Sequence, residues 1–344
     1  MSADSIRGHV GTLLLSILVA SVCAVAYGED KPAELPTALA TSYLPPDASF
    51  AILIRPAELA VPEVMQPVVE AFDELLKPAK LGISVADIDE FKLVLVGVVD
   101  MMERQGPRLV ATRIVNTYLV IRARQAVDWK TVFGVTGQAR QEEIDGRKLY
   151  HMRGDGAALW LPDERTVVCG ALGEVRRTME NPDPNDRESW TDHWEQAARS
   201  PLAAFVRMSE LEEVAAFVSG LEPIERQEEA LATLVADAEY GVLQGNVTTK
   251  GLEISATVLT RSNEGSVRVA PAVSLLLTEF ATTIGSELPA QQADAAKLRE
   301  QLAGLLGSTQ IVTEGKTVTV KALVTPKMIE VFSATARLLA RPRQ

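Results

Sequence analysis

Two stretches with the same order of residue types constrain the fold most. Ser49–Leu59 and Pro201–Leu211 each run from an apolar strand through an arginine, Arg55 or Arg207, into a turn and the start of a helix. Aligned without a gap, the two stretches also share a glutamate and a leucine at their ends. This repetition predicts two related halves. A purely local explanation is also open, because any strand-to-helix junction combines an apolar run with a polar cap.

Tight turns in the middle of the chain predict a four-stranded antiparallel meander. Asp145-Gly146 is typical of a two-residue hairpin turn, because both positions of that turn favour positive φ. A second turn, Pro162–Arg165, has proline in its first central position. The strands expected between these turns are Gln141–Ile144, Arg147–Met152, Ala157–Leu161 and Thr166–Cys169.

The remaining strands and helices alternate along the chain. Further strands are expected at Phe50–Ile54, Phe91–Val99, Leu109–Val115, Tyr118–Ala123, Leu202–Val206, Tyr240–Val247, Leu252–Leu259, Gln310–Thr313 and Thr317–Leu323. Helical spacing of apolar residues is expected from Val61 onward, over Ser209–Val235, Val267–Ile284 and Gln291–Leu306, and after Thr325-Pro326. Because the strands also pair through short turns, we predict an α+β fold of two similar halves, each an antiparallel sheet with helices packed on one face, and not a doubly wound parallel sheet.

Changes in composition divide the chain into five segments. The sharpest boundary is Asn181–Glu188, where two prolines interrupt a polar run. The segments are a signal peptide (1–28), a proline-rich tether (29–46), a first α+β half (47–180), a linker with a short helix (181–200) and a second α+β half (201–344).

The first segment has the three parts of a secretory signal. Arg7 and His9 precede the apolar run Val10–Val22, and Ala24-Val25-Ala26 follows with the small-x-small pattern that a signal peptidase needs. The apolar run is short for a membrane-spanning helix, which needs about 20 residues. We therefore expect an exported protein, located in the periplasm, in the cell envelope or outside the cell. The alternatives are an uncleaved membrane anchor and a lipoprotein modified at Cys23.

Charge and cysteine content argue against several classes of protein. The net charge of −12 argues against a nucleic-acid partner, because phosphate binding needs a basic face. Without the leader, Cys169 is the single cysteine, so neither an internal disulfide nor a Cys-rich zinc site is expected. The sequence also has no Gly-x-Ser-x-Gly nucleophile elbow and no phosphate-binding Gly-rich loop. It therefore assigns no catalytic residue, cofactor or metal ligand.

A few side chains are candidates for chemistry, each with a plainer explanation. His151 and His193 have no second histidine or cysteine at ligand spacing. Two groups of acidic residues are expected to form solvated surface. Paired carboxylates also serve glycoside hydrolysis or bind calcium, but neither group has the spacing of a calcium loop. These groups are Asp87, Asp89 and Glu90, and Glu142, Glu143 and Asp145. Cys169 ends an apolar strand, which favours a buried, unreactive thiol.

The four tryptophans lie in or next to the middle third of the chain. Aromatic side chains there are able to line a carbohydrate or peptide groove, but core packing is the more common use. The tryptophans are Trp129, Trp160, Trp190 and Trp194.

Several turn and cap motifs together resemble a known group of proteins. They are Tyr43–Ala48 before the first strand, Asp128-Trp129-Lys130, Asp145–Tyr150 and Pro162–Val168. With the leader, these motifs resemble the uncharacterised exported proteins common in planctomycete-type bacteria. The resemblance covers most of the first half and is weaker in the second. That family has no assigned activity, so the resemblance implies no catalytic residues.

The sequence as a whole predicts an exported, non-enzymatic protein that binds or scaffolds another component of the envelope. The expected partner is an envelope or extracellular protein or a glycan, and a membrane only if the leader is retained. The alternative is an envelope hydrolase whose site is assembled from distant Asp, Glu and His residues. His151 is the candidate histidine for that site.

Overall fold

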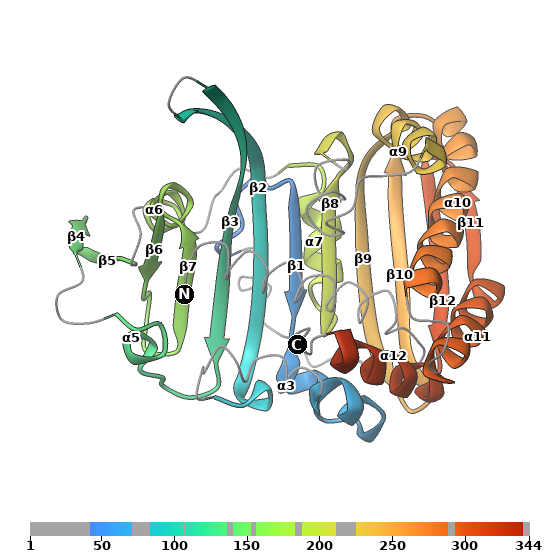
Figure 1. Ribbon diagram of the computed structural model, residues 1–344, viewed down its shortest axis with the longest axis horizontal. Coiled ribbons are helices and arrows are strands. Elements are labelled where there is room, and N and C mark those ends of the chain that lie inside the picture. Colours follow the sequence, from blue (N-terminus) through green and yellow to red (C-terminus); the bar gives the residue numbers. More distant parts are fainter. Residues whose placement is uncertain are drawn as a thin grey trace.

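The computed structural model describes most of the chain after the leader (Figure 1). The described residues are 42–70, 83–105, 108–135, 140–152, 156–182, 188–210, 225–287 and 293–339. For 98–105, 108–115, 225–226, 280, 283–287, 293–295, 332 and 334–339 the description covers the backbone alone. The predicted signal peptide, most of the tether and parts of two predicted helices, within 71–82 and 211–224, lie outside these residues.

The described residues form one antiparallel sheet of twelve strands. The strands are β1 (Phe50–Ile54), β2 (Ile88–Gln105), β3 (Arg108–Ala123), β4 (Gln141–Ile144), β5 (Arg147–His151), β6 (Ala157–Trp160), β7 (Thr166–Ala171), β8 (Leu202–Arg207), β9 (Ala238–Thr248), β10 (Gly251–Thr260), β11 (Gln310–Glu314) and β12 (Thr317–Val324). Their order is β11-β12-β10-β9-β8-β1-β2-β3-β7-β6-β5-β4. The α+β class with an antiparallel sheet is therefore confirmed, and the strands of both halves belong to one sheet.

The meander follows from its turns. Strands β4 to β7 are consecutive neighbours in the sheet, as the turn residues predict. Asp145 and Gly146 have φ angles of 49° and 76°, which is the backbone that a two-residue hairpin turn requires. This meander forms one edge of the sheet.

Helices cover both faces of the sheet. They are α3 (Pro56–Leu59), α5 (Trp129–Val132), α6 (Leu172–Glu180), α7 (Thr191–Ala197), α9 (Glu225–Asp237), α10 (Asn263–Glu287), α11 (Ala293–Ser308) and α12 (Pro326–Leu339), with 3-10 turns η1 (Glu63–Met65), η3 (Val85–Asp87) and η4 (Met208–Glu210). In the second half, α9 to α12 pack on one face of the sheet, as predicted. Helix α7, from the linker, packs on the opposite face against β8 and β9.

In the first half, α5 and α6 lie on opposite faces. Trp129 of α5 belongs to the same core cluster as Ile121, whereas Val175 of α6 belongs to the cluster of Val120. Adjacent residues of a strand point to opposite faces, so the two helices enclose β3 from both sides. The first half therefore has two buried faces near its meander.

The two aligned stretches meet at the centre of the sheet. Strands β1 and β8 pair antiparallel, and the middle pair is Ile52 with Ala204, the fourth residue of each stretch. The contacts at the ends of this pair are reciprocal. The amide of Arg55 donates to the carbonyl of Pro201 at 2.8 Å, and the amide of Arg207 donates to the carbonyl of Ser49 at 2.8 Å.

The guanidinium groups of the two arginines make matching contacts, each to the carbonyl one residue before the one that the backbone amide binds. Arg55 Nη1 donates to the carbonyl of Ser200 at 2.8 Å, and Arg207 Nε donates to the carbonyl of Ala48 at 3.5 Å. Ser200 and Ala48 each directly precede one of the aligned stretches. The arginines of the two aligned stretches therefore each bond across the junction of β1 with β8.

Candidate functional site

The β2–β3 hairpin extends well beyond the rest of the sheet (Figure 1). β2 pairs with β1 from Phe91 to Leu95, and β3 pairs with β7 from Tyr118 to Arg122. Beyond those positions, the register from Gly97↔Asn116 to Gln105↔Arg108 joins β2 and β3 only to each other among the described residues. We call residues 97–105 and 108–116 the arm. At about 3.3 Å per residue, the arm is about 30 Å long.

A β-bulge and a serine mark the point where the arm leaves the sheet. The register of β2 against β3 shifts between Leu95 and Gly97, which leaves Val96 without a register partner. Ser49 donates its amide to the carbonyl of Leu95 at 2.9 Å and its hydroxyl to the carbonyl of Val96 at 3.0 Å. A bulge increases the local twist and bends its strand, so it directs the arm away from β1.

A glycine allows β7 to end against β3 where the arm begins. Gly170 is the last β7 partner of β3, opposite Tyr118. A Cβ atom at Gly170 would lie 2.4 Å from the carbonyl oxygen of Thr117 and 2.5 Å from the Cα of Tyr118. These distances are too short for any side chain, so the close approach of β7 to β3 requires glycine at this position.

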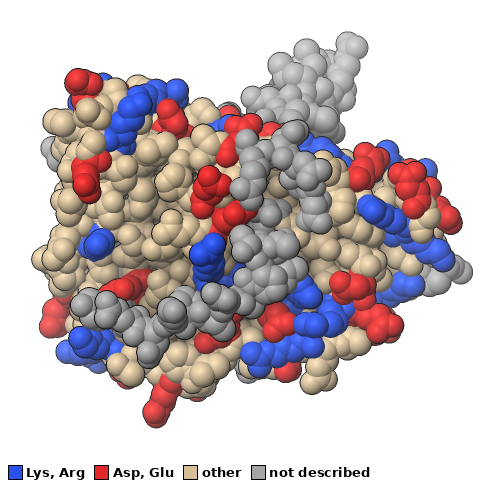
Figure 2. Space-filling view, turned by 180° about the vertical axis from the view of Figure 1, so that it is seen from behind, with Lys and Arg blue, Asp and Glu red and all other residues tan. Residues whose placement is uncertain are grey.

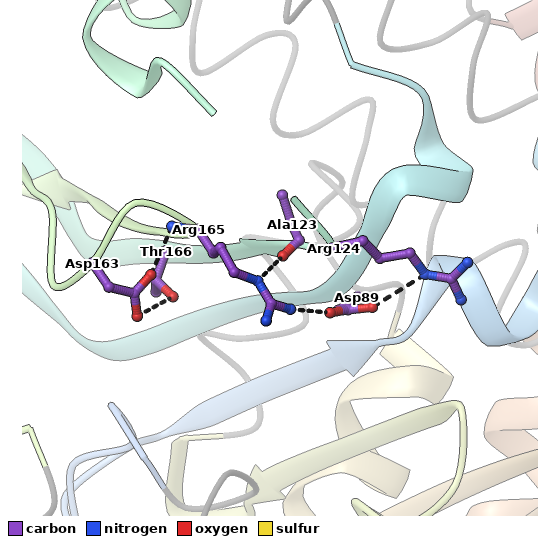
Figure 3. Close-up of polar contacts among 6 residues, drawn as sticks. All are labelled: Asp89, Ala123, Arg124, Asp163, Arg165 and Thr166. Atoms are coloured by element: carbon purple, nitrogen blue, oxygen red, sulfur yellow. Dashed lines mark hydrogen bonds and ion pairs between the residues drawn. The ribbon is translucent and has the colours of Figure 1, made fainter. Parts of the chain in front are cut away.

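At its other end, the hairpin is fixed by a small ion-pair network (Figure 3). Asp89 of β2 accepts a hydrogen bond from Arg165 Nη2 at 2.6 Å and another from Arg124 Nε at 3.3 Å. Arg165, from the β6–β7 turn, also donates through Nε to the carbonyl of Ala123 at 2.9 Å. One carboxylate therefore links β2 to the end of β3 and to the meander.

Backbone bonds and a turn carboxylate order the same region. The amide of Ala123 donates to the carbonyl of Arg165 at 2.9 Å. Asp163 accepts from the amide of Arg165 at 2.7 Å and from the hydroxyl of Thr166 at 3.1 Å (Figure 3). The three ion-pair side chains keep 35% to 50% of their area exposed, so each pair is worth less than a buried one. The β2–β3 hairpin is thus anchored at one end and projects at the other.

The predicted acidic group Asp87, Asp89 and Glu90 is divided by strand geometry, since its last two residues lie in β2. Asp89 faces the two arginines, whereas Glu90 points to the opposite face and pairs with Lys92, with Nζ and Oε1 3.1 Å apart. Lys92 is fully buried and also donates to the carbonyl of Ser42 at 2.8 Å. Asp87, Asp89 and Glu90 therefore do not form one carboxylate cluster. Both Asp89 and Glu90 are engaged in structural ion pairs.

Glu58 lies near this network and has a shifted pKa. Desolvation by burial raises the pKa of Glu58, and the charge of Arg55 partly opposes that shift. The negative charge of Asp89 raises it further. Arg55 Nε and Glu58 Oε1 are 3.7 Å apart, and the two residues are three positions apart in the first aligned stretch.

His151 meets one carboxylate and one arginine at the edge of the meander. Its Nε2 lies 3.4 Å from Glu142 Oε2, and Arg176 Nη2 of α6 donates to the same oxygen at 2.6 Å. Although desolvation acts in the opposite direction, the hydrogen bond and charge of Arg176, followed by those of His151, lower the pKa of Glu142. Glu143 alternates to the other side of β4. Of the predicted group Glu142, Glu143 and Asp145, the structure therefore brings Glu142 together with His151.

The tryptophans and Cys169 are part of the core, whereas His193 lies on the surface. All four tryptophans are buried, and burial also raises the pKa of the Cys169 thiol to about 12. His193 is exposed, and its Nδ1 lies 3.0 Å from the hydroxyl of Tyr240. Lining a groove is therefore not the role of the tryptophans, and Cys169 is protonated at neutral pH.

The face of the molecule that is turned away in Figure 1 carries charges of both signs (Figure 2). Lysines and arginines alternate there with aspartates and glutamates along the borders of the molecule. Within the described ranges, no three His, Cys, Asp or Glu side chains are arranged to hold a metal ion. No helix in this part of the chain combines the length and apolar character needed to cross a bilayer.

Comparisons with known proteins give structural matches alone. No protein-family model matches the sequence, and no curated protein matches it. Crystal form III of the treponemal protein TP0453 aligns with a TM-score of 0.42 and 9% identity, covering 88% of this chain and 100% of that one. Crystal form IV gives 0.42 and 9% over 86% and 95%, and form I gives 0.40 and 7% over 88% and 98%.

Proposed function

We propose that this is an exported, non-enzymatic protein of the cell envelope that binds or scaffolds another macromolecule through the arm. The observation that carries the proposal is the nine-pair ladder from Gly97↔Asn116 to Gln105↔Arg108, which extends past every described neighbouring strand. Export is supported by the signal-like leader, and the turn motifs that resemble exported planctomycete proteins agree with it.

The physics of a two-stranded ribbon supports a binding role. An isolated hairpin is at best marginally stable in water, and its outer edges present backbone amides and carbonyls without a ladder partner. A bound strand or surface satisfies those groups and adds side-chain contacts. The bulge at Leu95/Gly97, Gly170 and the Asp89 network all serve to fix the base of the arm.

A shortened hairpin tests this function. Gly97 and Asn116 are cross-strand partners, so replacing residues 98–115 with Asn-Gly closes the hairpin at its base with a favoured turn. We expect the shortened protein to keep its circular dichroism spectrum and exported location but to lose retention in the particulate envelope fraction. Equal retention of the shortened and full-length proteins would refute the arm as the binding element.

Processing of the leader has its own test. N-terminal sequencing of exported material should find a mature start near Tyr27 or Glu29. A chain that retains Met1 to Gly28 and stays in the membrane fraction would instead support the anchored alternative. Release of the processed protein by osmotic shock would place it in the periplasm.

We also propose that the two halves are copies of one unit. From the centre outward, β1-β2-β3-β7-β6 and β8-β9-β10-β12-β11 follow the same order, and Arg55 and Arg207 make matching contacts. The last helices differ, because α6 and α12 pack on opposite faces. A crystal structure in which the five strand pairs superpose, with Arg55 on Arg207, is the expected result. A best superposition that shifts these arginines apart would reject the repeat.

A hydrolase remains the second candidate, and one contact favours it. His151 Nε2 is 3.4 Å from the carboxylate of Glu142, a little longer than the about 2.6–3.2 Å of a catalytic hydrogen bond, which is often looser without substrate. Arg176 shares that carboxylate, which favours a structural role for the group. If the site is catalytic, His151→Ala abolishes hydrolysis of envelope glycans or peptides while the fold is retained. Unchanged activity in that variant would remove His151 from consideration.

A further inference from the structure

We propose that the partner of the arm is a second copy of this chain, paired antiparallel along the outer edge of β2. This inference rests on the proposed binding role of the arm and names its occupant. The β2 edge is open over the arm because β1 begins at Phe50, opposite Leu95, and no described strand continues alongside Gly97 to Gln105. The result would be a four-stranded ribbon with β2 strands at its centre.

Symmetry limits the registers that two identical strands can adopt. Side chains alternate between the two faces of a strand. A twofold axis perpendicular to the ribbon therefore relates the two strands only in registers where one residue lies directly opposite its own copy, and the axis passes between these two residues. An axis at Asp100, Glu103 or Arg104 would place identical charges opposite each other, which destabilises a pair of strands. An axis at Met101 would place Asp100 opposite Met102 of the partner subunit and would form no ion pair.

An axis at Met102 gives the complementary register. It places Asp100 opposite Arg104 of the partner subunit, and by symmetry forms the same pair a second time. Val99 then lies opposite Gln105 of the partner subunit, so no like charges meet over this segment. A ladder of this length supplies about six to eight backbone hydrogen bonds.

The β3 edge is a poorer self-partner. Its arm segment, Arg108 to Asn116, contains two arginines and no acidic residue, so no register forms an ion pair between copies. On the β2 edge, Asp100 already lies opposite Arg113 of its own hairpin. The proposed register therefore places an arginine position on each side of Asp100 in the ribbon.

Two sets of variants of the exported full chain test the pairing and its register. Arg104→Glu places like charges opposite each other twice, and we expect it to weaken the dimer about tenfold or more in sedimentation velocity. Arg108→Glu makes the same charge change on β3 and should leave the dimer unchanged. Met102→Cys should form an intermolecular disulfide under mild oxidation, whereas Glu103→Cys should not, and Cys169 is buried in both.

Each outcome decides the proposal. The proposal is overturned if the protein is a monomer at all concentrations from about 1 to 100 µM. It is also overturned if the dimer persists when residues 98–115 are replaced by Asn-Gly, or if Glu103→Cys forms the cross-link. If the chain is monomeric but envelope retention still depends on the arm, the self-pairing is wrong and the proposed function stands. If retention is also independent of the arm, both are wrong.

Discussion

Single residues determine how closely the strands around the arm approach one another. Gly170 is the clearest case, because its Cβ position is occupied by the backbone of Thr117 and Tyr118. Arg165 is another, since one side chain bonds both the Asp89 carboxylate and the Ala123 carbonyl. The turn Pro162–Arg165 is recognisable in the sequence, but the role of Arg165 is not, because its partner lies 76 positions away.

Replacing Gly170 with alanine should destabilise the protein strongly. The added methyl group would meet backbone atoms at 2.4 and 2.5 Å, and backbone cannot move aside as a flexible side chain can. We expect a loss of about 2 kcal/mol or more in urea unfolding. Gly173→Ala is the matched control, since it lies in α6 with open space around its Cβ position and should be neutral or stabilising. A mild effect at Gly170 would contradict the close approach of β7 to β3.

The contacts of Asp89 predict that its two arginines contribute unequally to the stability of the protein. Arg165→Met removes bonds of 2.6 and 2.9 Å and should cost about 1 kcal/mol. Arg124→Met removes one contact of 3.3 Å from a half-exposed side chain and should cost less. Chemical denaturation of the two variants side by side measures the difference. The reverse order would show that Arg165 does not link the hairpin to the meander.

At the scale of elements, ion pairs also join neighbouring helices. Asp237, the last residue of α9, accepts hydrogen bonds from Arg268 of α10, one of them from Nε at 2.6 Å. The hydrogen bond from Arg268 lowers the pKa of Asp237, against a smaller opposing effect of desolvation. A carboxyl whose pKa is lower in the folded state binds its proton more tightly in the unfolded state.

This pair gives a pH prediction with a defined sign. The contribution of Asp237 to stability is fully present above its unfolded pKa of about 3.9 and is lost as pH falls through its lower folded pKa. Asp237→Asn should therefore reduce stability at neutral pH and flatten the loss of stability between about pH 4 and pH 2. Thermal unfolding of both proteins across this range provides the measurement. Parallel pH profiles would show that Asp237 does not contribute.

At the scale of the whole molecule, the described strands of residues 47–180 and of residues 201–344 belong to one sheet. Pairing of β1 with β8 joins the halves through backbone bonds, and the same core cluster contains Ile52 of one half with Leu202 and Ile254 of the other. The linker helix α7 adds Trp194 to a second cluster that contains Leu53 and Phe205. Neither half is able to lose its structure without exposing the central strand of the other.

The shared sheet predicts a single cooperative unfolding transition. Tryptophan fluorescence reports on the first half and the linker, where Trp129, Trp160, Trp190 and Trp194 all lie, whereas far-ultraviolet circular dichroism reports on the whole chain. The two signals should have coincident midpoints in urea. A fluorescence transition that is clearly separated from the circular dichroism transition would show that the halves unfold independently.

Local patterns in the sequence predict most of the elements, because turns and apolar periodicity act over a few residues. The Asp145-Gly146 turn, the meander and the strand Phe50–Ile54 are confirmed for that reason. The strand expected at Phe91–Val99 was too short, and those at Leu109–Val115 and Tyr118–Ala123 are one strand, β3. The error arose because Asn116 and Thr117 look like a break locally but continue the ladder with β2.

Long-range pairing is decided by the tertiary structure. The two aligned stretches are recognisable in the chain, but the pairing of their strands depends on backbone bonds between residues about 150 positions apart, a separation over which local propensity has no influence. The projection of the arm likewise results from where β1 and β7 end, which is a property of the assembled sheet. Contacts of this kind have a large loop-closure cost and form because the completed core offsets it.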